Sequence, residues 1–258
     1  YLFNNASITS NAYSQDRKFG IITFNKDITA IGSEAFKGCA TLTAVTLPES
    51  IKTIGNHAFS GTGLTEFKLP SAAYHIGDYA FDGCTDLTDV DFGNVKIIGS
   101  YAFRDCGLTS VTLPEVAESF GVKPFQCSSL MEFNGPHLKG DKRSLQVGST
   151  LVQLADGACK GLTTYKVSDD VVNICEGVFQ NYTNLKTVTI PEGVKYIARN
   201  AFNGCSAIKK IILPSTLNML GKEKRTGRYP AGHRKNWKKA VVKLTEESKT
   251  IELFEGMV

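Results

Sequence analysis

Apolar and polar residues alternate along short stretches of the chain, most clearly within residues 31–53. Val45, Thr46 and Leu47 follow the apolar-polar-apolar order of a strand that buries one face. Pro48 comes next and is expected to end the strand, because proline has no amide hydrogen to donate to a neighbouring strand. This stretch therefore predicts one short strand with one side in a core.

A second pattern precedes this strand within the same stretch. Ile31, Ala35 and Phe36 are spaced at i, i+4 and i+5, which places them on one side of a short helical turn. Gly38 is a natural end for that turn, since glycine accepts the left-handed conformation common at helix C-termini. Each unit is thus expected to have a strand side and a helical side.

The unit repeats along the chain with a period of 22 or 23 residues. Its strand core, Leu42-x-x-Val45-x-Leu47, is typical of leucine-rich repeats, whose period is about 20 to 29 residues. One such repeat buries too little apolar surface to offset its loss of conformational entropy, so neighbouring repeats must share a core. The phenylalanine of the helical side recurs as Phe59, Phe81, Phe103, Phe125, Phe179 and Phe202.

The unbroken period predicts one elongated α/β solenoid over residues 1–258, with one short strand per repeat in a parallel sheet on one face. Strands are expected around Val45, Phe67, Val90, Val111 and Phe133. Five segments follow from the regularity of the pattern: a degenerate N-terminal repeat or cap at 1–30, regular repeats at 31–134, an insertion with a disrupted repeat at 135–160, regular repeats at 161–217, and a basic insertion with a degenerate C-terminal repeat at 218–258.

The stretches IGSEAFKGCATLTAVTLPESIKTIG, IGDYAFDGCTDLTDV and IIGSYAFRDCGLTSVTLPE resemble the BspA-like leucine-rich repeats, found in surface proteins of gut and oral bacteria and of some parasitic protists. The similarity covers roughly residues 8–217. It implies a right-handed solenoid and an extracellular, surface-attached protein that adheres to host matrix proteins or to other cells. It implies no catalytic residue, and the repeat motif itself carries over no binding residue because it is scaffold.

Seven cysteines are candidates for chemistry, and five of them occupy the same small position of the repeat. A periodic cysteine is most simply a small buried apolar side chain. Stacked thiols on neighbouring repeats rarely meet the dihedral that a disulfide requires, and an odd number also fits free thiols. The five are Cys39, Cys84, Cys106, Cys127 and Cys205; the other two are Cys159 and Cys175.

Signatures of enzymes and metal sites are missing from the sequence. Gly61 and Gly63 lack the third glycine of a dinucleotide-binding loop, and the motifs of P-loop proteins, serine hydrolases and zinc proteases do not occur. The four histidines occupy unrelated repeat positions and no C-x-x-C is present, which argues against zinc. We expect no enzymatic activity, no catalytic or cofactor-binding residue, and no metal.

The strand residues that point away from the core form a candidate protein-binding face, because solenoids commonly bind partners there. This face is acidic in its middle and has no aromatic anchor, so an ordinary solvated surface is the competing interpretation. Its residues are Ala44, Thr46, Glu66, Lys68, Asp89, Asp91, Ser110, Thr112, Glu132, Asn134, Thr187, Thr189, Lys210 and Ile212.

Residues 221–239 form a basic segment with eight lysines and arginines against one glutamate, or +7, whereas the whole chain carries +4 and the remainder therefore −3. Basic side chains interleaved with aromatic ones suit a sulfated glycan, a nucleic acid or an acidic protein surface. A solvated loop that protects the sheet end is the alternative, and no nucleic acid is expected because the repeats add no basic stripe. The candidate anion-binding residues are Lys222, Lys224, Arg225, Arg228, Arg234, Lys235, Trp237, Lys238 and Lys239.

These features favour a non-enzymatic, adhesin-like binding module at the cell surface or in the secreted state, with a protein partner such as a host extracellular-matrix protein. One alternative is a structural spacer without its own ligand, and another is polyanion binding through residues 221–239. The sequence contains no run of 18 apolar residues, so it predicts no transmembrane helix. Nothing at Tyr1 resembles a signal peptide, so neither a signal peptide nor an anchor is expected within this chain.

Overall fold

The computed structural model describes residues 3, 6–14, 19–135, 138, 139, 141–215, 217, 223, 224, 232 and 233. Backbone contacts divide the chain into two compact units. Unit 1 is Tyr1–Leu145 with Gln153–Ala158, and unit 2 is Gln146–Val152 with Cys159–Val258. The expectation of a single solenoid over residues 1–258 stays a prediction.

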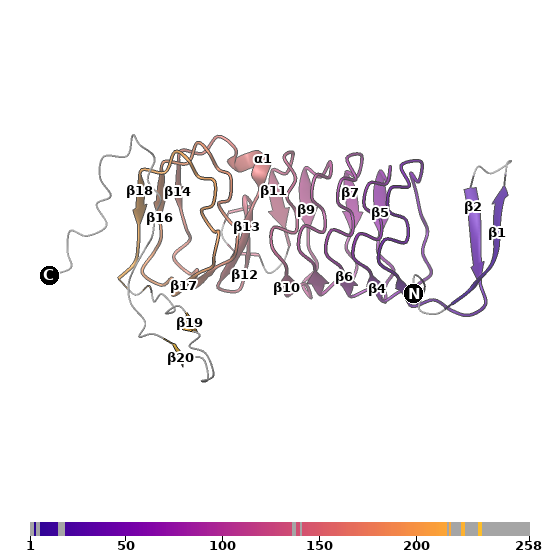
Figure 1. The fold of residues 1–258 in the computed structure, drawn as a ribbon. Coiled ribbons are helices and arrows are strands. Elements are labelled where there is room, and N and C mark those ends of the chain that lie inside the picture. Colours follow the sequence, from indigo (N-terminus) through magenta and orange to yellow (C-terminus); the bar gives the residue numbers. More distant parts are fainter. Residues whose placement is uncertain are drawn as a thin grey trace. The chain divides into compact units, whose positions relative to one another are not determined.

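Unit 1 contains two rows of short parallel strands, which form opposite edges of its stacked turns (Figure 1). The first row is one five-stranded sheet with the order β10-β8-β6-β4-β3. It consists of β3 (Ala30–Ile31), β4 (Thr53–Ile54), β6 (His75–Ile76), β8 (Ile97–Ile98) and β10 (Ser119–Phe120). The second row consists of β5 (Glu66–Lys68) paired with β7 (Asp89–Asp91), and β9 (Ser110–Thr112) paired with β11 (Glu132–Asn134).

The second row confirms the strands predicted around Phe67, Val90, Val111 and Phe133. In β5, β7 and β9 the middle residue is buried and both neighbours are exposed, as alternation requires. Val45 lies in no strand, although the Thr65 amide still donates to the Thr43 carbonyl at 3.3 Å. The row of β3, β4, β6, β8 and β10 was not predicted, because two residues per turn are too few to show a period.

The side predicted to be a helical turn is a ladder of turns that bond to each other. The Phe59 amide donates to the Ala80 carbonyl at 2.8 Å, and the Phe81 amide donates to the Ala102 carbonyl at 2.7 Å. These amides are therefore committed to the next repeat and cannot close the i to i−4 bonds of an α-helix. Within the described residues the one α-helix is α1 (Asp156–Cys159). The leucine-rich repeat solenoid is confirmed, with turns where helices were expected.

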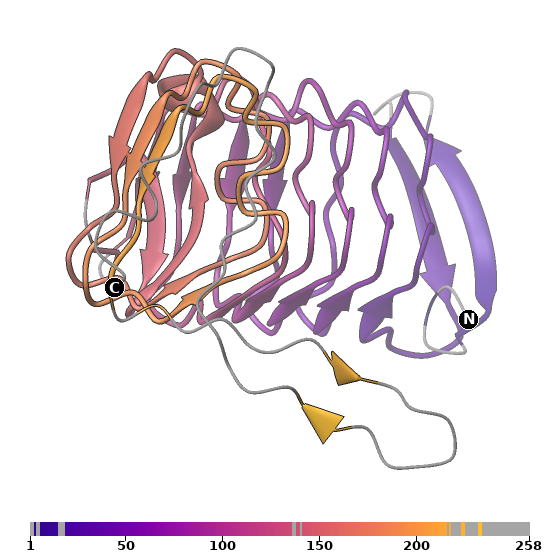
Figure 2. The same cartoon turned by 60° about the vertical axis from the view of Figure 1, so that its left-hand side comes forward.

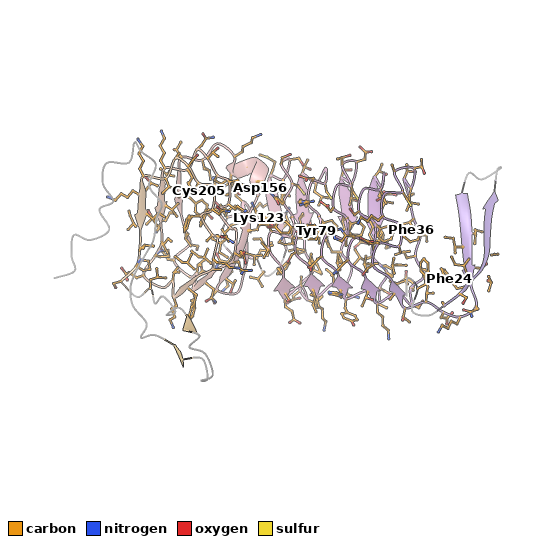
Figure 3. The ribbon with its side chains drawn as sticks, viewed as in Figure 1. Phe24, Phe36, Tyr79, Lys123, Asp156 and Cys205 are labelled. Carbon is orange, nitrogen blue, oxygen red and sulfur yellow. The ribbon has the colours of Figure 1, made fainter. Side chains whose placement is uncertain are left out.

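A column of phenylalanine rings runs through the core of unit 1. Phe59 and Phe81 stack with centroids 5.3 Å apart, and Phe81 and Phe103 stack at 4.9 Å with ring planes 5° apart. Phe36 and Phe125 extend the column at its two ends. Figure 3 shows Phe36 and Tyr79 among the side chains of these turns. The 22-residue period of the sequence therefore becomes direct ring-to-ring contact between turns.

Close approach of the turns depends on the glycine that follows the buried isoleucine of the first row. A Cβ atom at Gly99 would lie 2.5 Å from the Asp78 backbone nitrogen, and real Cβ atoms do not come so near to backbone. The Gly99 amide itself donates to the Ile76 carbonyl at 2.8 Å. Glycine is thus required here by space, which explains why Ile-Gly recurs in the repeat.

The N-terminal segment differs from the degenerate repeat expected at residues 1–30. Here β1 (Ile8–Ser14) pairs antiparallel with β2 (Phe19–Phe24), and Ile8 lies opposite Phe24. A repeat turn would have placed a single strand in the parallel sheet. Although Ile8 matches Ile31 in the sequence pattern, its side chain is 51% exposed. The role of this segment as a cap stays a prediction.

Residues 153–158 occupy the place of the missing turn beside Phe125, within the segment predicted to hold a disrupted repeat. The Gln153 side chain accepts a hydrogen bond from the Phe125 amide at 3.0 Å and donates one to the Phe125 carbonyl at 2.7 Å. One side-chain amide thus replaces backbone groups that a further repeat would have supplied. The buried Lys123 ammonium lies 3.6 Å from the Asp156 carboxylate, which compensates its charge.

Unit 2 has the same two kinds of strand rows (Figures 1 and 2). One sheet has the order β14-β16-β18, and the other has the order β12-β13-β15-β17. Phe179 and Phe202 stack at 4.9 Å in its core. Two strands, β12 (Ser144–Val147) and β13 (Thr150–Leu154), each have residues in both units. The remaining strands of unit 2 are β14 (Thr164–Lys166), β15 (Asn173–Ile174), β16 (Thr187–Thr189), β17 (Tyr196–Ile197), β18 (Lys210–Ile212), β19 (Glu223–Lys224) and β20 (Gly232–His233).

Candidate functional site

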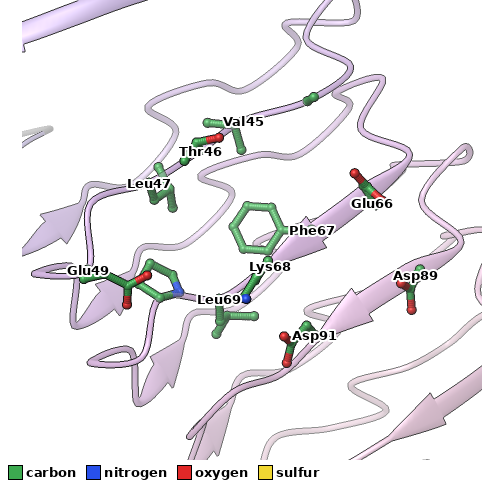
Figure 4. A pocket seen from close by; sticks show the side chains of 12 residues that line it. Val45, Thr46, Leu47, Glu49, Glu66, Phe67, Lys68, Leu69, Asp89 and Asp91 are labelled. Carbon is green, nitrogen blue, oxygen red and sulfur yellow. The ribbon is translucent and has the colours of Figure 1, made fainter.

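The outer face of β5 and β7, together with the preceding turn, forms a groove of about 450 Å³ on unit 1 (Figure 4). We call it the strand-face groove. The strands alternate inward and outward, so Phe67 and Val90 enter the core while their neighbours face solvent. The groove is lined by Ala44, Val45, Thr46, Leu47, Glu49, Glu66, Phe67, Lys68, Leu69, Pro70, Asp89 and Asp91.

The register of the two strands decides which charges are neighbours in the groove. Glu66 pairs with Asp89 and Lys68 pairs with Asp91, because β5 and β7 run parallel in the same register. The first pair places two like charges side by side and the second pair places opposite charges side by side. With Glu49, the lining contains four carboxylates and one ammonium group. The strand-face groove is therefore acidic and suits a basic ligand surface.

Two of the groove carboxylates accept hydrogen bonds from loop backbone. The Ser71 amide donates to Glu49 at 2.7 Å, and the Gly93 amide donates to Asp91 at 3.0 Å. Hydrogen bonding to Ser71 holds the pKa of Glu49 below its ordinary value. Because the folded pKa is depressed, this contribution to stability is present above the ordinary carboxyl pKa and is lost as the pH falls through the lowered one. Glu49 is consequently ionised at neutral pH.

Six of the predicted face residues gather in the strand-face groove: Ala44, Thr46, Glu66, Lys68, Asp89 and Asp91. The sequence analysis missed Glu49, which comes just after the strand position and joins the groove through the turn. Its position directly after Leu47-Pro48, at the end of the predicted strand, is the feature of the sequence that could have indicated it. Other predicted face residues of unit 1 lie on β9 and β11 outside the groove, and those of unit 2 lie on β16 and β18: Ser110, Thr112, Glu132, Asn134, Thr187, Thr189, Lys210 and Ile212.

The predicted anion-binding residues fall outside the part of the chain whose side chains the structure describes. In this segment the structure describes the backbone of β19 and β20 alone. There Glu223 pairs with His233, and Lys224 pairs with Gly232, in antiparallel register. The remaining candidates that lie outside the described residues are Lys222, Arg225, Arg228, Arg234, Lys235, Trp237, Lys238 and Lys239.

The repeat cysteines form a ladder along the turns. The Cys84, Cys106 and Cys127 thiols are buried, and each donates to the phenylalanine carbonyl of the preceding turn at 2.9 to 3.1 Å. None of the seven cysteines is joined in a disulfide. A hydrogen bond with Cys127, together with burial, raises the pKa of the Cys106 thiol. These buried thiols are therefore structural, because they pack between turns and donate to backbone carbonyl groups.

Cys39 departs from the burial expected of the repeat cysteines, since its side chain is exposed. A buried repeat cysteine is covered by the turn before it, and the residues before the Cys39 turn form the β1–β2 hairpin instead. The described residues contain no group of three or more histidine, cysteine, aspartate or glutamate side chains placed to hold a metal. No helix among them is long and apolar enough to cross a membrane.

Fold and site together define a solenoid of leucine-rich repeats with a solvated acidic groove on its strand face. The chain belongs to the BspA type of leucine-rich repeat proteins, because the sequence profile of that family matches residues 6–134 and 154–224 in six copies. The matched ranges include both rows of strands and the strand-face groove.

Solved structures show the same fold at low sequence identity. The pneumococcal vaccine antigen PcpA matches with a TM-score of 0.60 and 21% identity over 74% of this chain and 49% of that chain. A leucine-rich cell surface protein of Faecalibacterium prausnitzii matches with a TM-score of 0.56 and 23% identity over 74% of this chain and 59% of that one. A leucine-rich repeat protein of Eubacterium ventriosum matches with a TM-score of 0.56 and 19% identity over 73% of this chain and 58% of that one.

A short similarity of another kind links the chain to ribosomal proteins. It is 54% identical over 43 residues to the large ribosomal subunit protein uL23 of Caldicellulosiruptor saccharolyticus, and equally to that of Caldicellulosiruptor bescii. This similarity covers 17% of the chain and 44% of each ribosomal protein, so the chain spans less than half of these relatives.

Proposed function

We propose that the protein is a non-enzymatic binding module that acts at the cell surface or in the secreted state, and that the strand-face groove binds a basic surface of a protein partner. The family membership supports a repeat scaffold, and one structural neighbour is by name a cell surface protein. Repeat scaffolds present extended faces to partners.

The observation that carries this proposal is the charge arrangement of the strand-face groove. Four carboxylates converge from β5, β7 and the turn at Glu49, and Lys68 is the one basic side chain in the lining. A complementary partner surface carries lysine or arginine toward Glu66 and Asp89 and an acidic group toward Lys68. Such complementarity speeds association and fixes the register of the complex.

The test measures binding of the intact chain to immobilised fibronectin and fibrinogen over a salt series. In the test variant, Glu66, Asp89 and Asp91 are changed to lysine. The matched control carries the same change in net charge through Asp27, Asp105 and Glu118, none of which lines the groove. We expect the test variant to lose binding and the control to keep it. Equal binding by both variants would place the contact elsewhere, and no binding by the intact chain would favour a spacer.

A second candidate function, RNA binding by the basic segment at residues 221–239, is favoured by the similarity to ribosomal proteins. The repeats match residues 6–134 and 154–224, so residues 225–258 are the longest stretch outside them. We infer that most of the 43-residue similarity falls there, on and after the basic segment. This departs from the expectation of no nucleic acid, which was based on the repeats alone.

Binding to a fragment of ribosomal RNA distinguishes this candidate from the first. The measurement compares the intact chain with a variant in which six basic residues become serine: Lys222, Lys224, Arg225, Arg234, Lys235 and Lys238. RNA binding should weaken steeply with salt, and the variant should show a shallower slope because fewer counterions are released. RNA binding that is unchanged in the variant would rule out the basic segment as its site.

A further inference from the structure

The first strand row of unit 1 presents a second face whose charge is opposite to that of the strand-face groove. Backbone hydrogen bonds line up equivalent residues of successive turns: the Tyr74 amide donates to the Lys52 carbonyl at 3.0 Å, and the Lys96 amide donates to the Tyr74 carbonyl at 2.9 Å. The column continues from Thr29 at one end to Glu118 at the other. Side chains at equivalent positions of parallel strands point to the same side.

Three successive members of this column, Lys52, Tyr74 and Lys96, face solvent, and the two lysine charges have no acidic partner among the described ion pairs. Lys52 and Lys96 are exposed, and neither occurs in the ion pairs found among the described residues. Tyr74 between them is 43% exposed, and Ile97 beside Lys96 is 37% exposed. With neighbouring strands roughly 4.8 Å apart, the two lysine backbones are separated by two such steps. We call these four side chains the lysine-tyrosine stripe.

The surroundings of the stripe keep it electropositive. The adjacent column, in register through β3, β4, β6, β8 and β10, contributes no carboxylate. Glu118 is the single acidic side chain in the two columns, and it comes one turn after Lys96. The residues of the two columns are Thr29, Lys52, Tyr74, Lys96 and Glu118, and Ala30, Thr53, His75, Ile97 and Ser119.

We propose that the lysine-tyrosine stripe binds a linear sulfated polysaccharide. Sulfate groups on alternate sugars pair with Lys52 and Lys96, while the apolar face of the sugar between them packs on Tyr74 and Ile97. A nucleic acid strand fits less well, because it carries a phosphate about every 3.4 Å and the stripe offers only two cations across two strand spacings. The stripe also lacks the repeated aromatic side chains on which successive bases stack.

The test removes the basic segment as a competing site. The full chain with the six serine substitutions named above is the background for all variants, and heparin is the probe, with unsulfated dextran and a single-stranded homopolymer RNA as comparisons. In this background, changing Lys52 and Lys96 to serine should weaken heparin binding by at least about tenfold at low salt and flatten its salt dependence, since two charge contacts are lost. Tyr74→Ala should weaken heparin binding while leaving the salt slope unchanged.

Matched variants separate a site from general charge. Changing Lys37 and Lys142 to serine gives the same net charge outside the stripe and should leave heparin binding unchanged. Glu118→Lys extends the stripe by one cation and should strengthen heparin binding, a gain that misfolding cannot produce. Equal losses in the two double variants, no gain with Glu118→Lys, or RNA bound more tightly than heparin would each overturn the proposal.

Discussion

Phe81→Ala tests whether stacked rings hold the repeats of unit 1 together. The Phe81 side chain is 0% exposed, stacks on Phe59 at 5.3 Å and on Phe103 at 4.9 Å, and meets the edge of Phe67 at 4.6 Å. Truncation removes three aromatic contacts and leaves a cavity between turns whose backbones are fixed by interturn hydrogen bonds. The site can therefore collapse little.

The expected cost is about 3 to 5 kcal/mol of unfolding free energy, which combines lost burial with the cavity. Phe36→Ala is the matched control, because Phe36 is half-buried at the end of the column and stacks on one repeat phenylalanine alone. Removing a partly exposed ring should cost about 1 to 2 kcal/mol. The difference between the two variants isolates the effect of enclosure between two turns.

Urea unfolding measures the total loss, and hydrogen exchange locates it. Because each repeat contacts mainly its neighbours, amides within residues 55–115 should lose protection first in the Phe81→Ala variant. Unchanged exchange in this region, or equal destabilisation by Phe36→Ala, would show that the ring column does not couple the repeats.

Three further predictions concern single features of unit 1. Cys39 should react rapidly with a thiol reagent under native conditions while Cys84 and Cys106 remain unlabelled, and fast labelling of the latter two would contradict their burial. Gln153→Leu should destabilise the protein by about 2 to 5 kcal/mol, since the backbone amide and carbonyl of Phe125 lose their hydrogen-bond partners. Urea titration measures the loss of unfolding free energy, and an unchanged value would show that Gln153 does not replace a repeat. Gly99→Ala should cost at least about 1 to 3 kcal/mol through overlap with the preceding turn, seen as a lowered melting temperature, whereas an unchanged melting temperature would show that the turns can move apart.

The local pattern of the sequence was sufficient for the class of fold. A phenylalanine every 22 or 23 residues and an alternating strand after it leave stacking as the way to bury the apolar side of each turn. The inward positions Phe67 and Val90 and the outward positions Glu66 and Asp89 followed from the period of two. These features depend on neighbours along the chain and are therefore visible in it.

Contacts between turns decided the rest, because they join residues about 22 positions apart that no local period records. The helical side became a hydrogen-bonded ladder only because the next turn offers carbonyl groups, as Ala80 does to Phe59. Glu49 joined the strand-face groove through the turn, and Cys39 lost its cover because β1 and β2 pair with each other. Gln153 replaces a missing repeat by a side-chain geometry that only the folded chain defines.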